Sequence, residues 1–131
     1  MNFENVVKQG LLYKRGNLLK MYSNQYHFYL EKRDEIKGTG PYLKYGRKGK
    51  NVAYVIDLSF KSVEGTDAEN GIMALREPDS RTKFRVITTT QTHHFKADDS
   101  NDRDKWIKSI LKTISLIQLR HKDEHFEEDR E

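Results

Sequence analysis

The 131-residue sequence predicts a mainly β domain with one C-terminal α-helix. Short runs in which apolar and polar residues alternate recur between turn residues, which is typical of half-buried strands. After Ala97 the apolar period lengthens to three or four residues, which indicates a helix. Strands at this spacing, followed by one helix, indicate a sandwich or a small barrel that the helix closes at one end.

The first strand is predicted over residues 6–15, where Leu12 and Lys14 share one face. Turn residues such as Gly, Asn and Pro separate this strand from the later ones. Later strands are predicted from the same two-residue period at 26–30, 42–45, 53–58, 71–75, 84–88 and 93–97. Turns are predicted at 15–17 and 38–41, and a basic loop at 46–51.

The helix is predicted to begin near Ser100. Asp99 or Ser100 itself can cap it, and Asp102 and Asp104 place negative charge in the first turn, where the helix dipole favours it. An apolar stripe then continues to about Leu119, so the helix has about 18 residues and is roughly 27 Å long. The stripe consists of Trp106, Ile107, Ile110, Ile114 and Ile117.

The composition limits the class of protein. Hydrophobic residues make up 35% and charged residues 34%, the mean hydropathy is -0.90, and no apolar run approaches the roughly 18 residues of a spanning helix. The absence of Cys excludes a disulfide scaffold, a thiolate zinc site and a cysteine nucleophile. Aromatic residues make up 11%, which argues against a disordered chain. Met1–Val7 does not resemble a signal peptide, so a cytoplasmic setting is expected.

Positive charge is concentrated in one third of the chain. Eleven Lys or Arg lie between Lys8 and Lys50, against three acidic residues. The last eleven residues, 121–131, carry two basic and six acidic residues, so we divide the chain into a domain at 1–120 and an acidic tail that is a helix extension or a linker. Clustered charge of one sign indicates phosphates on nucleic acid, phosphates on lipid headgroups, or an acidic protein as the partner.

Several motifs, taken in their order along the chain, resemble the pleckstrin-homology (PH) family. The resemblance runs from about Lys8 to Leu119 and implies seven antiparallel strands in two nearly orthogonal sheets, a partly open barrel capped by the helix. The motifs are Lys8-x-Gly10-x-Leu12-x-Lys14-x-Gly16, Ile56-x-Leu58, Phe84-x-Val86-x-Thr88, His93-x-Phe95-x-Ala97 and Asp104-x-Trp106-Ile107-x-x-Ile110.

The resemblance also implies where a ligand would bind. In the family, headgroup phosphates are held at the open end formed by the first three strands. The resemblance places Lys14 at the first-strand lysine and Lys44 near a third-strand position where a Tyr often sits, while the surrounding loops contribute Lys20, Arg47, Lys48 and Lys50. Several donors that converge from neighbouring segments suit a polyphosphate, whereas the alternative is a charged surface that serves solubility alone.

One position departs from the family pattern. Phosphoinositide binders of this family usually carry an Arg on the second strand just before its apolar pair. Here that position falls on Tyr26 or, by an ungapped count from Lys14, on Gln25. The bidentate Arg contact is therefore missing, and broader or weaker recognition of anionic lipid is expected.

Apolar residues surround Lys20 in the first loop. These residues are Leu18, Leu19 and Met21. Apolar side chains at the tip of a hairpin are expected to have few packing partners, so they could enter a lipid interface, where each buried CH₂ contributes roughly 0.8 kcal/mol. In the alternative arrangement, Leu19 or Met21 folds back on the barrel.

No motif predicts catalysis, a cofactor or a metal. His121 and His125 fit the pattern H-x-x-E-H, but they lie in a charged tail without an evident third ligand. We expect His93 to pack as a strand residue and Trp106 to belong to the core.

The sequence therefore predicts a non-enzymatic module that recruits its parent protein to phosphoinositide-bearing or other anionic membranes. Inositol phosphate would be the soluble ligand, and the domain would be monomeric, cytoplasmic and peripheral to the membrane. Its parent could be a larger kinase, phospholipase or scaffold. A PH-like interaction domain for an acidic or phosphorylated peptide is the alternative. Nucleic acid is not expected, because Tyr22, Tyr26 and Tyr42 form no recognised RNA motif.

Overall fold

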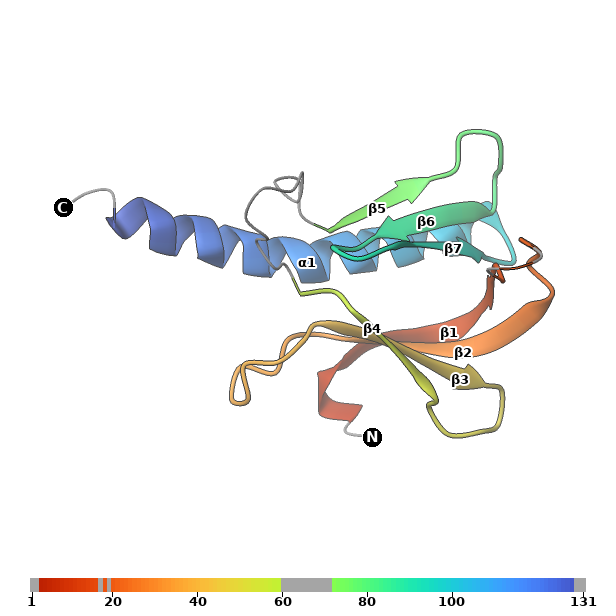
Figure 1. Cartoon of the computed structure of the whole chain (residues 1–131), viewed down its shortest axis with the longest axis horizontal. Helices are drawn as coiled ribbons and strands as arrows, with labels where there is room; N and C mark the ends of the chain where they lie inside the picture. Colours follow the sequence, from red (N-terminus) through yellow and green to blue (C-terminus); the bar gives the residue numbers. More distant parts are fainter. Residues whose placement is uncertain (1–2, 17, 19, 60–71, 129–131) are drawn as a thin grey trace.

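The computed structural model describes residues 3–16, 18, 20–59 and 72–128, and side chains as far as residue 114. All of its strands precede a long helix, as Figure 1 shows. The elements are a 3-10 turn η1 (Phe3–Asn5), β1 (Val6–Lys14), β2 (Asn24–Glu31), β3 (Tyr42–Arg47), β4 (Tyr54–Asp57), β5 (Met73–Arg76), β6 (Lys83–Ile87), β7 (Thr92–Lys96) and α1 (Ser100–Glu128).

The seven strands form one antiparallel sheet with the order β4-β3-β2-β1-β7-β6-β5. β1 pairs with β2 along most of its length, but it pairs with β7 only through Tyr13 and Lys14. This short connection divides the sheet into two halves, which lie one above the other in Figure 1. The predicted mainly β fold with a C-terminal helix is therefore confirmed. Hydrogen bonds join the two expected sheets into one that is not closed.

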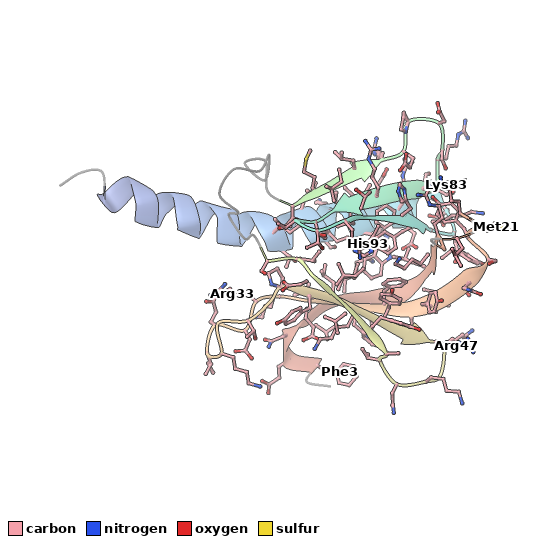
Figure 2. All side chains as sticks on the ribbon, in the orientation of Figure 1. Phe3, Met21, Arg33, Arg47, Lys83 and His93 are labelled. Carbon is pink, nitrogen blue, oxygen red and sulfur yellow. The ribbon has the colours of Figure 1, made fainter. Side chains whose placement is uncertain are left out.

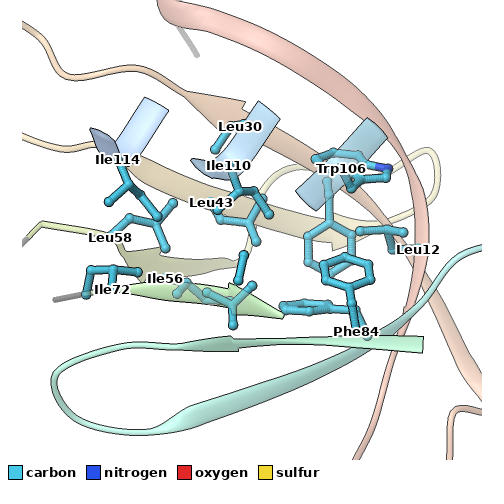
Figure 3. Packing of buried hydrophobic residues seen from close by; sticks show 14 of the residues in the cluster. Leu12, Leu30, Leu43, Ile56, Leu58, Ile72, Phe84, Trp106, Ile110 and Ile114 are labelled. Carbon is cyan, nitrogen blue, oxygen red and sulfur yellow. The ribbon is translucent and has the colours of Figure 1, made fainter. Parts of the chain in front are cut away.

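Inward-facing side chains from both halves and from α1 form one core. Trp106 is fully buried and packs among Leu12 and Phe84 at one end, while Ile114 and Leu58 lie at the other (Figure 3). Gly10 lies against the indole, since a Cβ at this position would be in van der Waals contact with Trp106 at 3.5 Å. The core cluster consists of Leu12, Phe28, Leu30, Leu43, Ile56, Leu58, Ile72, Ala74, Phe84, Val86, Phe95, Ala97, Trp106, Ile110 and Ile114.

The helix begins where the sequence predicts. The Asp99 side chain accepts a hydrogen bond from the backbone N–H of Asp102 at 2.7 Å, which caps the first turn. α1 then continues to Glu128, beyond the expected end near Leu119, because its sequence contains neither Gly nor Pro. Among the described residues, no helix is long and apolar enough to cross a membrane.

The connection between β3 and β4 folds back closely over the end of β3. Lys50 N–H donates to Arg47 O at 2.9 Å, and Ala53 N–H donates to Tyr45 O at 3.0 Å. A Cβ on Gly46 would lie 2.4 Å from Asn51 O, so only glycine allows the two backbones to approach this closely.

Replacement of Trp106 with Ala should lower the free energy of unfolding by about 3–5 kcal/mol, because the indole is fully buried between the helix and the sheet. Chemical denaturation measures this change. Ile36→Ala is the matched control, since Ile36 is 99% exposed and its truncation should change stability by less than about 0.5 kcal/mol. Equal losses for the two variants would contradict the assigned core.

Candidate functional site

The loops β1–β2 and β3–β4 lie at the same end of the sheet, because β1 to β4 pair as antiparallel neighbours. Figure 2 shows Met21 of the first loop and Arg47 of the third strand toward this end, and Arg33 of the β2–β3 loop at the opposite one. We call the end with Met21 and Arg47 the open end. It carries the loops in which the sequence analysis placed most of the candidate binding residues.

A cavity of about 210 Å³ lies at the open end, between β1, β2, β3 and β4. Two cations, three phenols and one amide face it, and no carboxylate among the described residues lines it. We call it the open-end cavity. Its lining side chains are Lys14, Arg15, Asn24, Tyr26, Tyr45 and Tyr54.

Lys14 reaches this cavity because it shares the inward-facing phase of β1 with buried Leu12. Its ammonium lies 6.0 Å from the centre of the Tyr45 ring. Burial, followed by the positive charge of Arg15, lowers the pKa of Lys14 below its ordinary value. Burial and a neighbouring positive charge both disfavour the charged form of this lysine, and an anion bound beside it would stabilise that form.

The three tyrosines form one cluster on the cavity wall. Tyr45 stacks on Tyr54 with ring centres 4.9 Å apart, and Tyr26 meets Tyr45 edge to face at 5.3 Å. Burial, and then the neighbouring Tyr26 and Tyr54, raise the pKa of Tyr45 to about 12. The Tyr45 phenol therefore stays protonated at neutral pH and can donate a hydrogen bond.

Lys44 lies on the opposite face of the sheet. Its neighbours Leu43 and Tyr45 pack inward, so Lys44 points outward, where its Nζ is 2.7 Å from Glu31 Oε2 and 5.4 Å from the centre of the Tyr42 ring. This corrects the expected convergence of Lys14 and Lys44. The structure brings Tyr45, one residue further along β3, to the cavity instead.

Lys20 lines a second cavity, of about 350 Å³, between the β1–β2 loop and the β5–β6 hairpin. Its backbone adopts the left-handed conformation, with φ of 51°, and its N–H donates to Gly16 O at 3.1 Å. Glu77 and Asp79 also line this second cavity, which makes it less suited to a polyanion than the open-end cavity. Arg15 lines both cavities.

The remaining candidate cations lie around the rim. Arg47, Lys48 and Lys50 are exposed and do not line the open-end cavity. Arg47 is in register with Tyr26 of β2, so it extends the positive charge outward from the cavity wall. We call these three residues the rim cations.

Two of the three apolar loop residues are described, and both are exposed. Leu18 is 96% exposed and Met21 is 57% exposed, so neither folds back into the core. Leu19 lies outside the described residues.

The sequence reasoning missed Arg15 and Tyr54 as cavity residues. The sequence predicts only that Arg15 lies where the first strand meets a turn and that Tyr54 belongs to a strand. A signal existed for Tyr54, because the inward phase of β4 that buries Ile56 also turns Tyr54 toward Tyr26 and Tyr45. No comparable signal existed for Arg15, which follows the end of β1.

His93 packs inward on β7, as expected, and is 7% exposed. The Gln91 amide Nε2 donates to His93 Nε2 at 3.1 Å, which suits a neutral imidazole. Burial, and then the charges of Lys14 and His94, lower the pKa of His93 to about 4.

Among the described residues, no cluster of His, Asp and Glu could hold a metal ion. The backbone of α1 includes His121 and His125, but their side chains lie outside the described residues.

Comparison with known sequences shows one family. The family model described as PH domain matches residues 6–115. A sterol 3-beta-glucosyltransferase of Aspergillus terreus is 33% identical over 116 residues, which cover 82% of this chain and 7% of that protein. The Xenopus laevis protein "Differentially expressed in FDCP 6 homolog" is 29% identical over 119 residues, or 88% of this chain and 17% of that protein. The chain thus spans only a small part of the curated relatives it matches.

Solved structures share the fold. The C-terminal PH domain of pleckstrin in complex with D-myo-Ins(1,2,3,5,6)P5 superposes with a TM-score of 0.64 at 21% identity, covering 83% of this chain and 95% of that chain. A chain in the crystal structure of human RhoA in complex with the DH/PH fragment of PDZRHOGEF gives a TM-score of 0.62 at 15% identity. The match covers 86% of this chain and 29% of that chain. At these identities the likeness concerns the fold alone.

The depressed pKa of His93 should make the domain less stable in acid. Between pH 6.5 and about 4 the unfolded chain binds a proton at this residue and the folded chain does not, so the free energy of unfolding falls as the pH falls through this window. The slope contributed by His93 is at most about 1.4 kcal/mol per pH unit.

Urea denaturation of the wild type and of His93→Gln at several pH values measures this slope, which should be smaller in the variant. An unchanged slope in His93→Gln would refute the assignment.

Proposed function

The chain belongs to the PH domain family, and from this premise we propose that it docks its parent protein on anionic, phosphoinositide-bearing membrane surfaces through the open end. The observation that carries the proposal is a cavity with two cations and no carboxylate among its described lining residues. We also infer that the module is one part of a longer protein, since it matches only 7% and 17% of two relatives.

The rim cations support docking on a charged surface. Arg47, Lys48 and Lys50 project into solvent at the same end as the cavity. Each Lys or Arg near an anionic bilayer contributes about 1 kcal/mol, and the attraction fades within a Debye length. The rim would therefore orient the domain with its open end toward the bilayer before the cavity meets a headgroup.

The exposed loop side chains support a second contact with lipid. Leu18 and Met21 lie in the β1–β2 loop, next to Arg15 and Lys20. Aliphatic side chains gain about 0.8 kcal/mol for each CH₂ that enters the bilayer. Partial insertion would therefore slow dissociation after the cations have brought the loop to the surface.

Among the solved neighbours, the C-terminal PH domain of pleckstrin is described in complexes with two inositol pentakisphosphates. That ligand class supports an inositol-based headgroup as the ligand of the open-end cavity. An acidic or phosphorylated peptide remains the second candidate, because it would meet the same cations. The exposed Leu18 and Met21 favour the lipid, since a peptide bound in the cavity leaves them without a role.

Reversal of two rim charges should weaken vesicle binding about tenfold or more, because each removed cation costs about 1 kcal/mol at an anionic surface. Lys48→Glu with Lys50→Glu is the test variant, and Lys105→Glu with Lys108→Glu, on the exposed face of α1, is the matched control. Co-sedimentation with phosphatidylcholine vesicles, with and without phosphatidylserine, measures the change.

Equal losses in the two charge-reversed variants would show that net charge alone acts, which would overturn docking through the open end. Equal binding of the wild type to neutral and anionic vesicles would reject the lipid proposal altogether. Binding to a phosphopeptide without binding to any vesicle would favour the second candidate.

Leu18→Ser with Met21→Ser should speed dissociation from anionic vesicles about tenfold, because the loop loses its insertion into the bilayer. Its affinity for a soluble inositol phosphate should not change. Surface plasmon resonance on captured vesicles measures the dissociation rate. Ile36→Ser, which alters an exposed apolar residue at the opposite end, is the control and should dissociate like the wild type. A dissociation rate that the double variant leaves unchanged would exclude the insertion.

A further inference from the structure

The open-end cavity is lined mainly by neutral donors. Its two cations, Lys14 and Arg15, are outnumbered by the phenols of Tyr26, Tyr45 and Tyr54 and the amide of Asn24. The other candidate cations lie elsewhere. Lys44 is paired with Glu31 on the opposite face, Lys20 lines the second cavity, and the rim cations project into solvent.

This distribution limits how much negative charge the cavity can accept. A phosphate monoester carries a charge of about −1.5 to −2 at neutral pH, which Lys14 and Arg15 together can neutralise. Further phosphates held inside the cavity would meet phenols rather than cations, because Arg47, beside Tyr26, is exposed and does not line the cavity. An anion that leaves water without a cationic partner loses more hydration free energy than neutral hydrogen bonds return.

The neutral donors suit the rest of a sugar-like headgroup. A phenol both donates and accepts a hydrogen bond, and the Asn24 amide does the same. These are the partners that free ring hydroxyls require. Tyr26 and Tyr45 are partly buried with ring centres 5.3 Å apart, and both line the cavity.

We propose that the open-end cavity binds a polyol headgroup that carries a single monoester phosphate, and that Tyr26 and Tyr54 determine this preference by supplying hydroxyl groups instead of charge. The inference rests on the proposed function and specifies its ligand. Lys14 and Arg15 hold the phosphate, the phenols and Asn24 hold the ring hydroxyls, and the rim cations contact the surrounding bilayer.

Tyr26 provides the sharpest test, because it lies on the cavity wall. Tyr26→Phe removes one hydroxyl and should weaken binding of the monophosphorylated headgroup about 3- to 10-fold, the effect of one hydrogen bond. Tyr29→Phe is the matched control, since it makes the same change on the same strand but on the outward face, and it should bind like the wild type.

Tyr26→Arg should reverse the preference. A guanidinium at this position adds a third charge inside the cavity and should raise the affinity for a trisphosphorylated headgroup about tenfold or more. Calorimetry with soluble glycerophosphoinositols that carry one or three monoester phosphates measures the ratio. Vesicles with the corresponding lipids, free inorganic phosphate and phosphoserine separate a lipid headgroup from other phosphate sources. Thermal unfolding shows that each variant is folded.

The proposal requires the wild type to bind the monophosphorylated headgroup at least as tightly as the trisphosphorylated one, and more tightly than inorganic phosphate or phosphoserine. A stronger wild-type preference for three phosphates, or equal binding by Tyr26→Phe and the wild type, would overturn it. If anionic vesicles bind through the rim but no inositol phosphate binds in solution, this inference fails and the proposed function stands. If no vesicle binds, both fail.

Discussion

The inward-facing row of β1 determines both the core and the candidate site. Gly10 lies against Trp106, Leu12 is buried in the core and Lys14 reaches the open-end cavity, all from alternate positions of one strand. β1 is also the strand that joins the two halves of the sheet, through Tyr13 and Lys14. A shift of one residue in its register would expose Leu12 and remove Lys14 from the cavity, so the core and the proposed ligand site depend on the same strand pairing.

The strands could be predicted from the alternation of apolar and polar residues, because each strand is buried on one face. The helix could be predicted from its apolar period and from its Asp99 cap. The same alternation correctly turned Lys14 inward. It could not orient Lys44, because three of the four residues in Tyr42-Leu43-Lys44-Tyr45 are apolar or aromatic and either phase is plausible. The burial of Leu43 and Tyr45 decides the phase, and Lys44 then pairs with Glu31 of the neighbouring strand, a contact that the sequence of one strand does not reveal.

The loops account for the remaining differences. Lys20 turns toward the second cavity through a left-handed backbone conformation that side-chain periodicity does not encode. Arg15 lies just after β1 and lines both cavities, although a reading by residue type assigns it to a turn. In the proposed function, this site separates two kinds of recognition. The rim cations attract a charged surface over a distance, whereas the phenols, Lys14 and Arg15 of the open-end cavity distinguish ligands at contact.

The absence of a side chain at Gly46 affects how mutations of this domain should be interpreted. Asn51 O occupies the space that a methyl group would need, so an alanine there would push away the turn that carries Arg47, Lys48 and Lys50. Such a variant could keep its interior packing and still fail at a charged surface. In a mutational scan, Gly46 would then be scored as a ligand-binding residue although it contacts no ligand. The loss of binding would come from the displaced neighbouring residues.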